Sequence, residues 1–179
     1  MTTTHALRLL CLAACAAAST LAHARCPEYK EIVAFVANYL NRTPAKAFPS
    51  VKTMGDAQCA QGALAAELAR HQGLLAGFRA GFTNKTMQQT YKIEGPLRAF
   101  LFKNMFLNDG ASVDAAYGAR PWFEANFIAV VKDDALQQAK TPLEALEHIS
   151  HFLPYIELTD FALAFDEPLT KVSMLATNV

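Results

Sequence analysis

The chain has 179 residues, of which 53% are hydrophobic and 18% are charged, enough apolar material for a buried core and too much for an intrinsically disordered segment. The 16 Lys and Arg side chains balance 16 Asp and Glu side chains, so the formal net charge is zero. Because no like-charge run accompanies this balance, charge gives no reason to expect nucleic acid or an anionic membrane surface as a partner.

The N-terminus has the pattern of a secretory signal. A basic residue precedes an almost wholly apolar run over residues 9–21, and Ala22-His23-Ala24 fits the small-x-small pattern that signal peptidase cleaves. The run is shorter than the roughly 20 residues of a transmembrane helix. We therefore predict a signal peptide over residues 1–24, no transmembrane segment, and one exported domain over residues 25–179, located in the periplasm or outside the cell. Leu12-Ala13-Ala14-Cys15 leaves a lipoprotein signal open as an alternative.

Cleavage after Ala24 would leave two cysteines in the mature chain, Cys26 and Cys59. In an oxidising compartment, two such cysteines are expected to form a disulfide. Two isolated thiols remain the alternative, because sequence spacing does not show whether the two Cβ atoms meet.

Helices are expected first along the chain and strands later, which predicts an α+β fold with a mixed β core. Apolar residues at helical spacing predict helices over 28–40 and 56–72. Residues 74–82 are expected to form a buried strand, and Asn84 is expected to cap a short helix. In the apolar run over 100–107, the side chains of Phe100, Phe102 and Phe106 alternate as in a buried strand.

The C-terminal half is expected to continue with strands and two helices. Residues 121–132 are the strongest strand candidate. Thr141-Pro142-Leu143-Glu144 combines a capping box with proline at the first helical position, which predicts a helix as far as Phe152. His148 and His151 would then share one helical face as solvated side chains, with a zinc pair as the alternative. A strand over 153–159 and a helix entered at Asp166 complete the prediction.

Short motifs spread over most of the chain resemble the 2-keto-4-pentenoate hydratases, a branch of the fumarylacetoacetate hydrolase superfamily. Each motif is unspecific alone, and their common order and spacing carry the resemblance. The motifs are Asp56-Ala57 with Gln61, Gly77-Phe78-Arg79-Ala80-Gly81-Phe82-Thr83-Asn84-Lys85, Met87-Gln88-Gln89, Leu101-Phe102-Lys103-Asn104-Met105, Asn108-Asp109-Gly110, Arg120-Pro121-Trp122-Phe123-Glu124-Ala125-Asn126-Phe127-Ile128-Ala129 and Leu153-Pro154-Tyr155-Ile156-Glu157-Leu158.

The resemblance implies a metal-dependent hydro-lyase that adds water to a small 2-oxo or 2-hydroxydienoic acid. A divalent cation, Mg²⁺ or Mn²⁺, would stabilise the enolate, and such hard cations prefer oxygen ligands. Family members hold the ion with a Glu-x-Glu pair on one strand and a third Glu from a later strand. By resemblance, the metal ligands here are Glu124, Asn126 and Glu157, and Arg79 is the catalytic-site cation.

This sequence departs from the family pattern at several of these positions. Asn126 replaces the second glutamate, so the site has two carboxylates instead of three. Arg79 replaces a lysine and keeps the charge, but it does not act as an acid or base near neutral pH. Leu97 replaces an aspartate, and the chain ends near Asn178 where family members continue with residues that complete the β core.

Two function classes follow from this pattern. The first is a hydratase of the family type with weak or no activity, which Glu124 and Glu157 favour. The alternative is a non-catalytic exported relative that binds a small 2-oxo acid or a protein partner, which Asn126, Arg79 and Leu97 favour. A homo-oligomer is compatible with either class.

Overall fold

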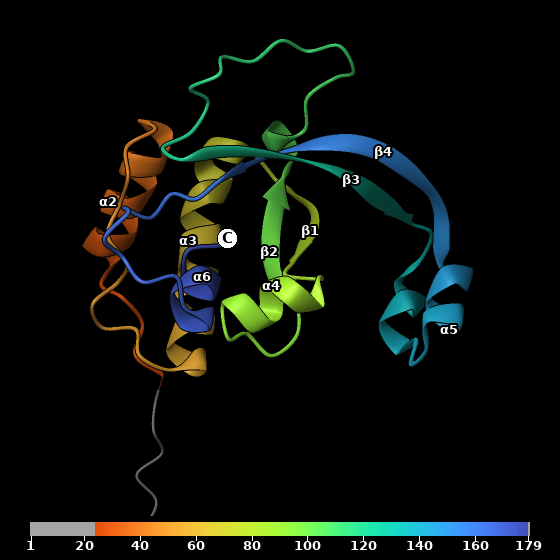
Figure 1. The fold of residues 1–179 in the computed structure, drawn as a ribbon, viewed down its shortest axis with the longest axis horizontal. Coiled ribbons are helices and arrows are strands. Elements are labelled where there is room, and N and C mark those ends of the chain that lie inside the picture. Colours follow the sequence, from red (N-terminus) through yellow and green to blue (C-terminus); the bar gives the residue numbers. More distant parts are fainter. Residues whose placement is uncertain (1–23, 179) are drawn as a thin grey trace, which may run out of the picture.

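The computed structural model describes residues 24–178, so the predicted signal peptide lies outside the described residues except for Ala24. Helices precede two antiparallel two-stranded sheets, which confirms the α+β prediction (Figure 1). The elements in chain order are α2 (Tyr29–Leu40), α3 (Met54–Gln72), β1 (Leu75–Gly81), α4 (Lys85–Thr90), β2 (Leu97–Phe102), the 3₁₀ turn η1 (Lys103–Met105), β3 (Pro121–Val131), the 3₁₀ turn η2 (Asp134–Gln138), α5 (Pro142–Glu147), β4 (Ile149–Asp160) and α6 (Lys171–Ala176).

The helices α2, α3 and α6 surround the main core. Capping boxes start both long helices, with Glu28 and Glu31 at α2 and Thr53 and Asp56 at α3. Gly73, with φ of 79°, ends α3 in a conformation that glycine adopts without a Cβ clash. The core side chains come from these helices, from β2 and from two connecting segments: Ile32, Phe35, Val36, Phe48, Ala57, Ala60, Leu64, Leu68, Phe102, Leu163, Leu175 and Ala176.

A disulfide joins Cys26 to Cys59, with the two Cα atoms 5.3 Å apart. This confirms the predicted pair. The bond fastens the segment that precedes α2 to the middle of α3, so the two helices are linked covalently as well as by packing.

The strand β1 is more exposed than the sequence suggested. Leu74 is 80% exposed and Phe78 is 54% exposed, so the expectation of a buried strand over 74–82 was wrong. β1 pairs with β2 alone, and β2 is the strand that contacts α3 and α6. As a result β1 lies on the outer side of the pair, away from the helices (Figure 1).

The strand after α4 also begins and ends earlier than expected. Its pairing with β1 ends at Leu75 opposite Phe102, and the chain then turns through η1. Phe102 is buried, whereas Phe106 lies beyond the strand and is 43% exposed. The prediction of Phe106 as a core residue was therefore wrong, because the strand has no partner past Phe102 to continue the alternation.

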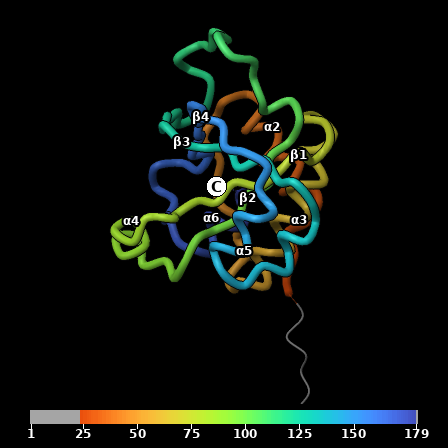
Figure 2. The backbone as a smooth tube through the Cα atoms, turned by 90° about the vertical axis from the view of Figure 1, so that its right-hand side faces the viewer, coloured from red at the N-terminus to blue at the C-terminus, as the bar shows by residue number. Residues whose placement is uncertain are grey.

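β3 and β4 form a long antiparallel ribbon that arches away from the helices and carries α5 at its far end (Figure 1). The loop over residues 106–120 leads into the ribbon and stands out from the body in both views (Figure 2). At the base of the ribbon, the Asp160 carboxylate accepts hydrogen bonds from the backbone N–H groups of Ala119 (3.0 Å) and Arg120 (2.7 Å). These bonds fix where β3 begins relative to the end of β4.

The helix expected to reach Phe152 ends at Glu147, and β4 begins at Ile149. The backbone N–H of Lys132 donates to the carbonyl of His148 (2.8 Å), and Val131 pairs with Ile149. The residues from Ile149 onward therefore form a strand paired with β3 instead of continuing the helix. His148 is the C-cap and His151 lies in β4, which removes the shared helical face and with it the basis for a zinc pair.

The last helix begins at Lys171 instead of near Asp166. Thr170 caps it by accepting a hydrogen bond from the Ser173 N–H. Among residues 24–178, no helix has the length and hydropathy of a membrane span.

Candidate functional site

Glu157 is a buried carboxylate in the middle of β4. Its side chain is 10% exposed, and it lies directly opposite Glu124 in the β3–β4 register. The structure thus places two of the three predicted metal ligands on neighbouring strands. A carboxylate at this depth needs charge compensation and hydrogen-bond donors.

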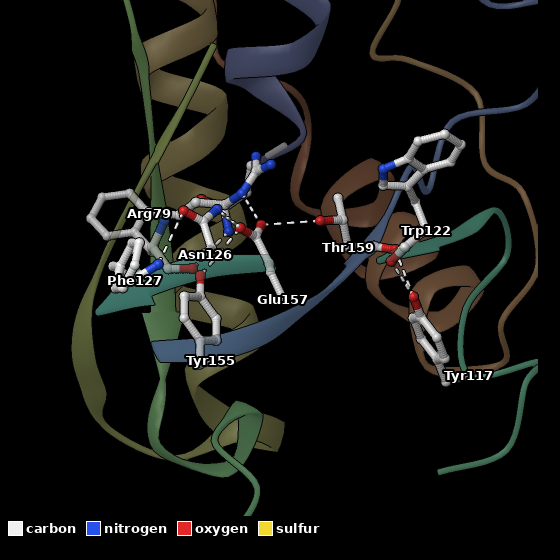
Figure 3. A network of polar contacts seen from close by, with 10 residues as sticks. Arg79, Tyr117, Trp122, Asn126, Phe127, Tyr155, Glu157 and Thr159 are labelled. Carbon is white, nitrogen blue, oxygen red and sulfur yellow. Dashed lines mark hydrogen bonds and ion pairs between the residues drawn. The ribbon is translucent and has the colours of Figure 1, made fainter. Parts of the chain in front are cut away.

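Four side chains donate to the Glu157 carboxylate (Figure 3). Arg79 Nε forms an ion pair with Oε1, and Thr159 Oγ1 donates to the same oxygen at 3.0 Å. Asn126 Nδ2 donates to Oε2 at 2.9 Å, and the Tyr155 hydroxyl donates to Oε2 at 3.2 Å. All four acceptor positions of the carboxylate are therefore used.

Strand alternation brings three of these residues to one face of β4. Tyr155, Glu157 and Thr159 occupy alternate positions, and Asn126 lies opposite Tyr155 in β3. Arg79 comes from β1, in the other sheet, so the ion pair joins the two sheets across 78 residues of sequence. We call these five residues the Glu157 network.

The pKa of the Tyr155 hydroxyl is raised to about 12. Burial is the main cause, followed by the negative charge of Glu157 and the hydrogen bond to it. The phenol therefore stays protonated at neutral pH and acts as a hydrogen-bond donor to the carboxylate.

The network lies at the wall of a cavity of about 1040 Å³ between the helices, β2 and the ribbon. Arg79, Tyr155 and Glu157 line it, whereas Glu124 and Asn126 are not among its lining residues. Of the two carboxylates expected to share a metal ion, only Glu157 lines the cavity. The remaining wall is largely apolar, with Phe35, Leu64, Leu68, Phe100, Ile128 and Leu153.

The cavity has a polar side as well. Asn108 and Asp109 of the long loop and Asn104 of η1 contribute to its lining. An apolar cavity with a few convergent polar groups is the usual form of a small-molecule site.

The three residues predicted as metal ligands do not form a ligand set for a divalent ion in this arrangement. Both oxygens of Glu157 accept hydrogen bonds, one of them from a cation. Asn126 turns its amide nitrogen toward Glu157, while its oxygen accepts from the Phe127 N–H at 3.2 Å. Within residues 24–178, no group of three or more His, Cys, Asp or Glu side chains is placed to hold an ion.

The sequence prediction placed Arg79 near Glu157 and missed Tyr155 and Thr159. Both lie two residues from Glu157, so the period-two rule for strands was the signal that could have found them. The catalytic role expected for Arg79 and the metal role expected for Glu124, Asn126 and Glu157 stay predictions.

No protein-family model and no curated protein sequence matches this chain. Solved structures do match. 4-Oxalocrotonate decarboxylase from Pseudomonas putida G7, complexed with magnesium and adipate, is similar to this chain with a TM-score of 0.70 and 21% identity, over 84% of this chain and 58% of that one. The same enzyme complexed with calcium and acetate has a TM-score of 0.69 and 20% identity, over 84% and 57%.

These neighbours show that the chain shares the fold of 4-oxalocrotonate decarboxylase over most of its own length. The chain spans less than three-fifths of the length of either one. Assignment to the hydratase branch stays a prediction.

Proposed function

We propose that this protein binds a small 2-oxo acid or dicarboxylate in the cavity beside Arg79 and has little or no hydratase activity. One observation carries the proposal: a cation, Arg79, and its partner Glu157 line a cavity that also has extensive apolar walls. Arg79 uses Nε toward Glu157. A guanidinium has five N–H donors, and its two terminal nitrogens remain for a ligand carboxylate.

The residues of the network suit binding better than turnover. Arg79 does not exchange protons near neutral pH. The raised pKa of Tyr155 keeps its phenol protonated, so it is not a base. Both oxygens of Glu157 accept hydrogen bonds, one of them from a cation, which disfavours this carboxylate as a proton acceptor for a ligand.

Metal-dependent hydration remains the second candidate. Two observations favour it: Glu124 and Glu157 lie opposite each other, and the structural neighbours are complexed with magnesium or calcium and a carboxylate. On this hypothesis, Mg²⁺ or Mn²⁺ would bind Glu124, Asn126 and Glu157 after the network rearranges.

We also propose export, which the Cys26–Cys59 disulfide supports, since disulfides persist in oxidising compartments.

Calorimetric titration with pyruvate and adipate, in EDTA and then in Mg²⁺, tests the proposal. We expect binding by the natural protein and at least about tenfold weaker binding by Arg79→Met, because a charge-assisted hydrogen bond is worth about 1.5–3 kcal/mol. Arg98→Met is the matched control, since Arg98 stacks on Phe78 and Phe100 and is not itself a lining residue of the cavity.

An absorbance assay with a 2-hydroxydienoate distinguishes the two candidates. The proposal predicts no loss of dienoate absorbance with Mg²⁺ or Mn²⁺. Metal-dependent turnover by the natural protein would reject the non-catalytic proposal and favour the hydratase.

A further inference from the structure

We infer that Arg79 is an internal cation that takes the place of a divalent metal ion at Glu157, so that the cavity holds a small carboxylate without metal. A divalent site would open only when the guanidinium is removed. The inference deepens the proposed function, and the test of carboxylate binding described below rests on that function. The test of metal binding is independent of it.

The first argument is the saturation of Glu157. Oε1 accepts from Arg79 and Thr159, and Oε2 accepts from Asn126 and Tyr155. A carboxylate offers about four acceptor positions. An ion therefore has to displace at least one donor and leave that donor without its partner in a site where Glu157 is 10% exposed and Arg79 is 16% exposed.

The second argument is the orientation of Asn126. A hard cation needs the amide oxygen, but the nitrogen faces Glu157 and the oxygen accepts from the Phe127 backbone. Turning the amide over would remove one donor from Glu157 and place the amide nitrogen against the Phe127 N–H, so that two donors would face each other. The hydrogen-bond network thus stabilises the orientation that does not bind metal.

The third argument is charge. Arg79, Glu124 and Glu157 together carry a net charge of −1, because one guanidinium compensates one of two carboxylates. A divalent ion beside Glu157 would lie within a few ångströms of the guanidinium, and like charges at that distance repel strongly in a partly buried site. Without Arg79, the same two carboxylates would carry −2 and attract the ion.

The guanidinium is also held in place. It comes from a paired strand, with Arg79 opposite Ala99, and Nη1 lies over Gly81, where a Cβ would be 2.9 Å away. Its position therefore depends on the backbone of β1, and it does not swing aside without loss of the Glu157 ion pair.

The test is a titration of the purified full chain with Mn²⁺ alone, followed by the electron paramagnetic resonance signal of free Mn²⁺. We compare the natural protein with Arg79→Met, which keeps an unbranched stem without the charge, and with Arg79→Lys, which keeps the charge. The double variant Arg79→Met/Glu157→Gln controls for the site, and Arg98→Met controls for the loss of a positive charge elsewhere.

We expect one Mn²⁺ to bind per chain of Arg79→Met at least tenfold more tightly than to the natural protein. The double variant, Arg79→Lys and Arg98→Met should resemble the natural protein. Tight binding of one Mn²⁺ by the natural protein would overturn the inference. A folded Arg79→Met variant that fails to bind Mn²⁺ would overturn it as well. If that variant does not fold, the inference is judged by whether the natural protein binds Mn²⁺.

The ligand measurement separates failure of the inference from failure of the proposed function. Equal binding of pyruvate or adipate in EDTA and in Mg²⁺ supports both. Binding that requires Mg²⁺ overturns the inference and leaves the carboxylate-binding function intact. Absence of binding under both conditions overturns the proposed function, and the Mn²⁺ titration then decides the inference alone.

Discussion

Gly81 leaves the space in which the Arg79 guanidinium lies. A Cβ at this position would be 2.9 Å from Arg79 Nη1, which is closer than a side-chain carbon normally approaches a nitrogen. The neighbouring Gly77 is different, because a Cβ there would meet no atom within 4 Å. The two glycines of one strand therefore provide a matched pair for testing the position of Arg79.

For Gly81→Ala, we expect thermal stability close to that of the natural protein and carboxylate binding at least about tenfold weaker. The clash is with Nη1, the far end of a flexible side chain, so the terminal nitrogens shift away from the ligand while Nε keeps its partner Glu157 and the fold loses little stability. Calorimetric titration with adipate and thermal unfolding measure the two effects. Gly77→Ala should bind as the natural protein does, and equal binding by both variants would contradict the assignment of Gly81.

At the scale of elements, the start of α3 is organised around Asp56. Its carboxylate accepts from the backbone N–H groups of Arg25 (2.5 Å), Lys52 (3.0 Å) and Thr53 (2.9 Å). These hydrogen bonds hold the pKa of Asp56 well below its usual value, and the bond from Arg25 makes the largest contribution. Signal cleavage after Ala24, as the sequence predicts, would turn the Arg25 nitrogen into an α-ammonium group beside this carboxylate.

We expect Asp56→Asn to lower the melting temperature at neutral pH, because the variant loses the charge that three N–H donors stabilise. The folded-state pKa is lowered, so the stabilisation is present above the ordinary pKa of about 4 and is lost as the pH falls below it. The difference in melting temperature between the two proteins should therefore shrink in acid. Exposed Asp166 is the control position, and a constant difference from pH 7 down to pH 2 would contradict this account.

The β3–β4 ribbon separates polar and apolar side chains between its two faces. Glu124, Asn126, Tyr155 and Glu157 share one face, while the other presents Phe123, Phe127 and Ile156, each more than two-thirds exposed. The ribbon therefore contributes Tyr155, Glu157 and Thr159 to the cavity wall and almost nothing to the core.

At the scale of the whole molecule, the Cys26–Cys59 disulfide closes a loop of 33 residues that includes all of α2. Because the helices form the main core, constraint of this loop in the unfolded chain should stabilise the entire fold. The chain-entropy relation gives roughly 3–4 kcal/mol for a loop of this size.

We therefore expect reduction of the disulfide, or the double variant Cys26→Ser/Cys59→Ser, to lower the free energy of unfolding by roughly 3–4 kcal/mol. Urea denaturation of the oxidised and reduced proteins measures it. The reduced natural protein and the double variant should agree. Equal urea midpoints for oxidised and reduced protein would show that the bond does not constrain the unfolded chain as assumed.

The sequence by itself favoured a Cys26–Cys59 disulfide without excluding two free thiols. It determined the order of helices and strands and the placement of Glu124 and Glu157 on strands. These features depend on local signals: helical spacing, N-caps such as Thr141, and strand alternation. Resemblance to a known family also led to the correct fold type, although no single motif was specific.

Only the tertiary structure decided which faces are buried and what surrounds Glu157. β1 was expected to be buried but lies outside its partner strand, and α5 ends at Glu147 because pairing with β3 captures the residues that follow. The ion pair of Arg79 with Glu157 joins two sheets across 78 residues. Such contacts depend on how separate elements pack, and the spacing of residues along one element carries no information about a partner on another.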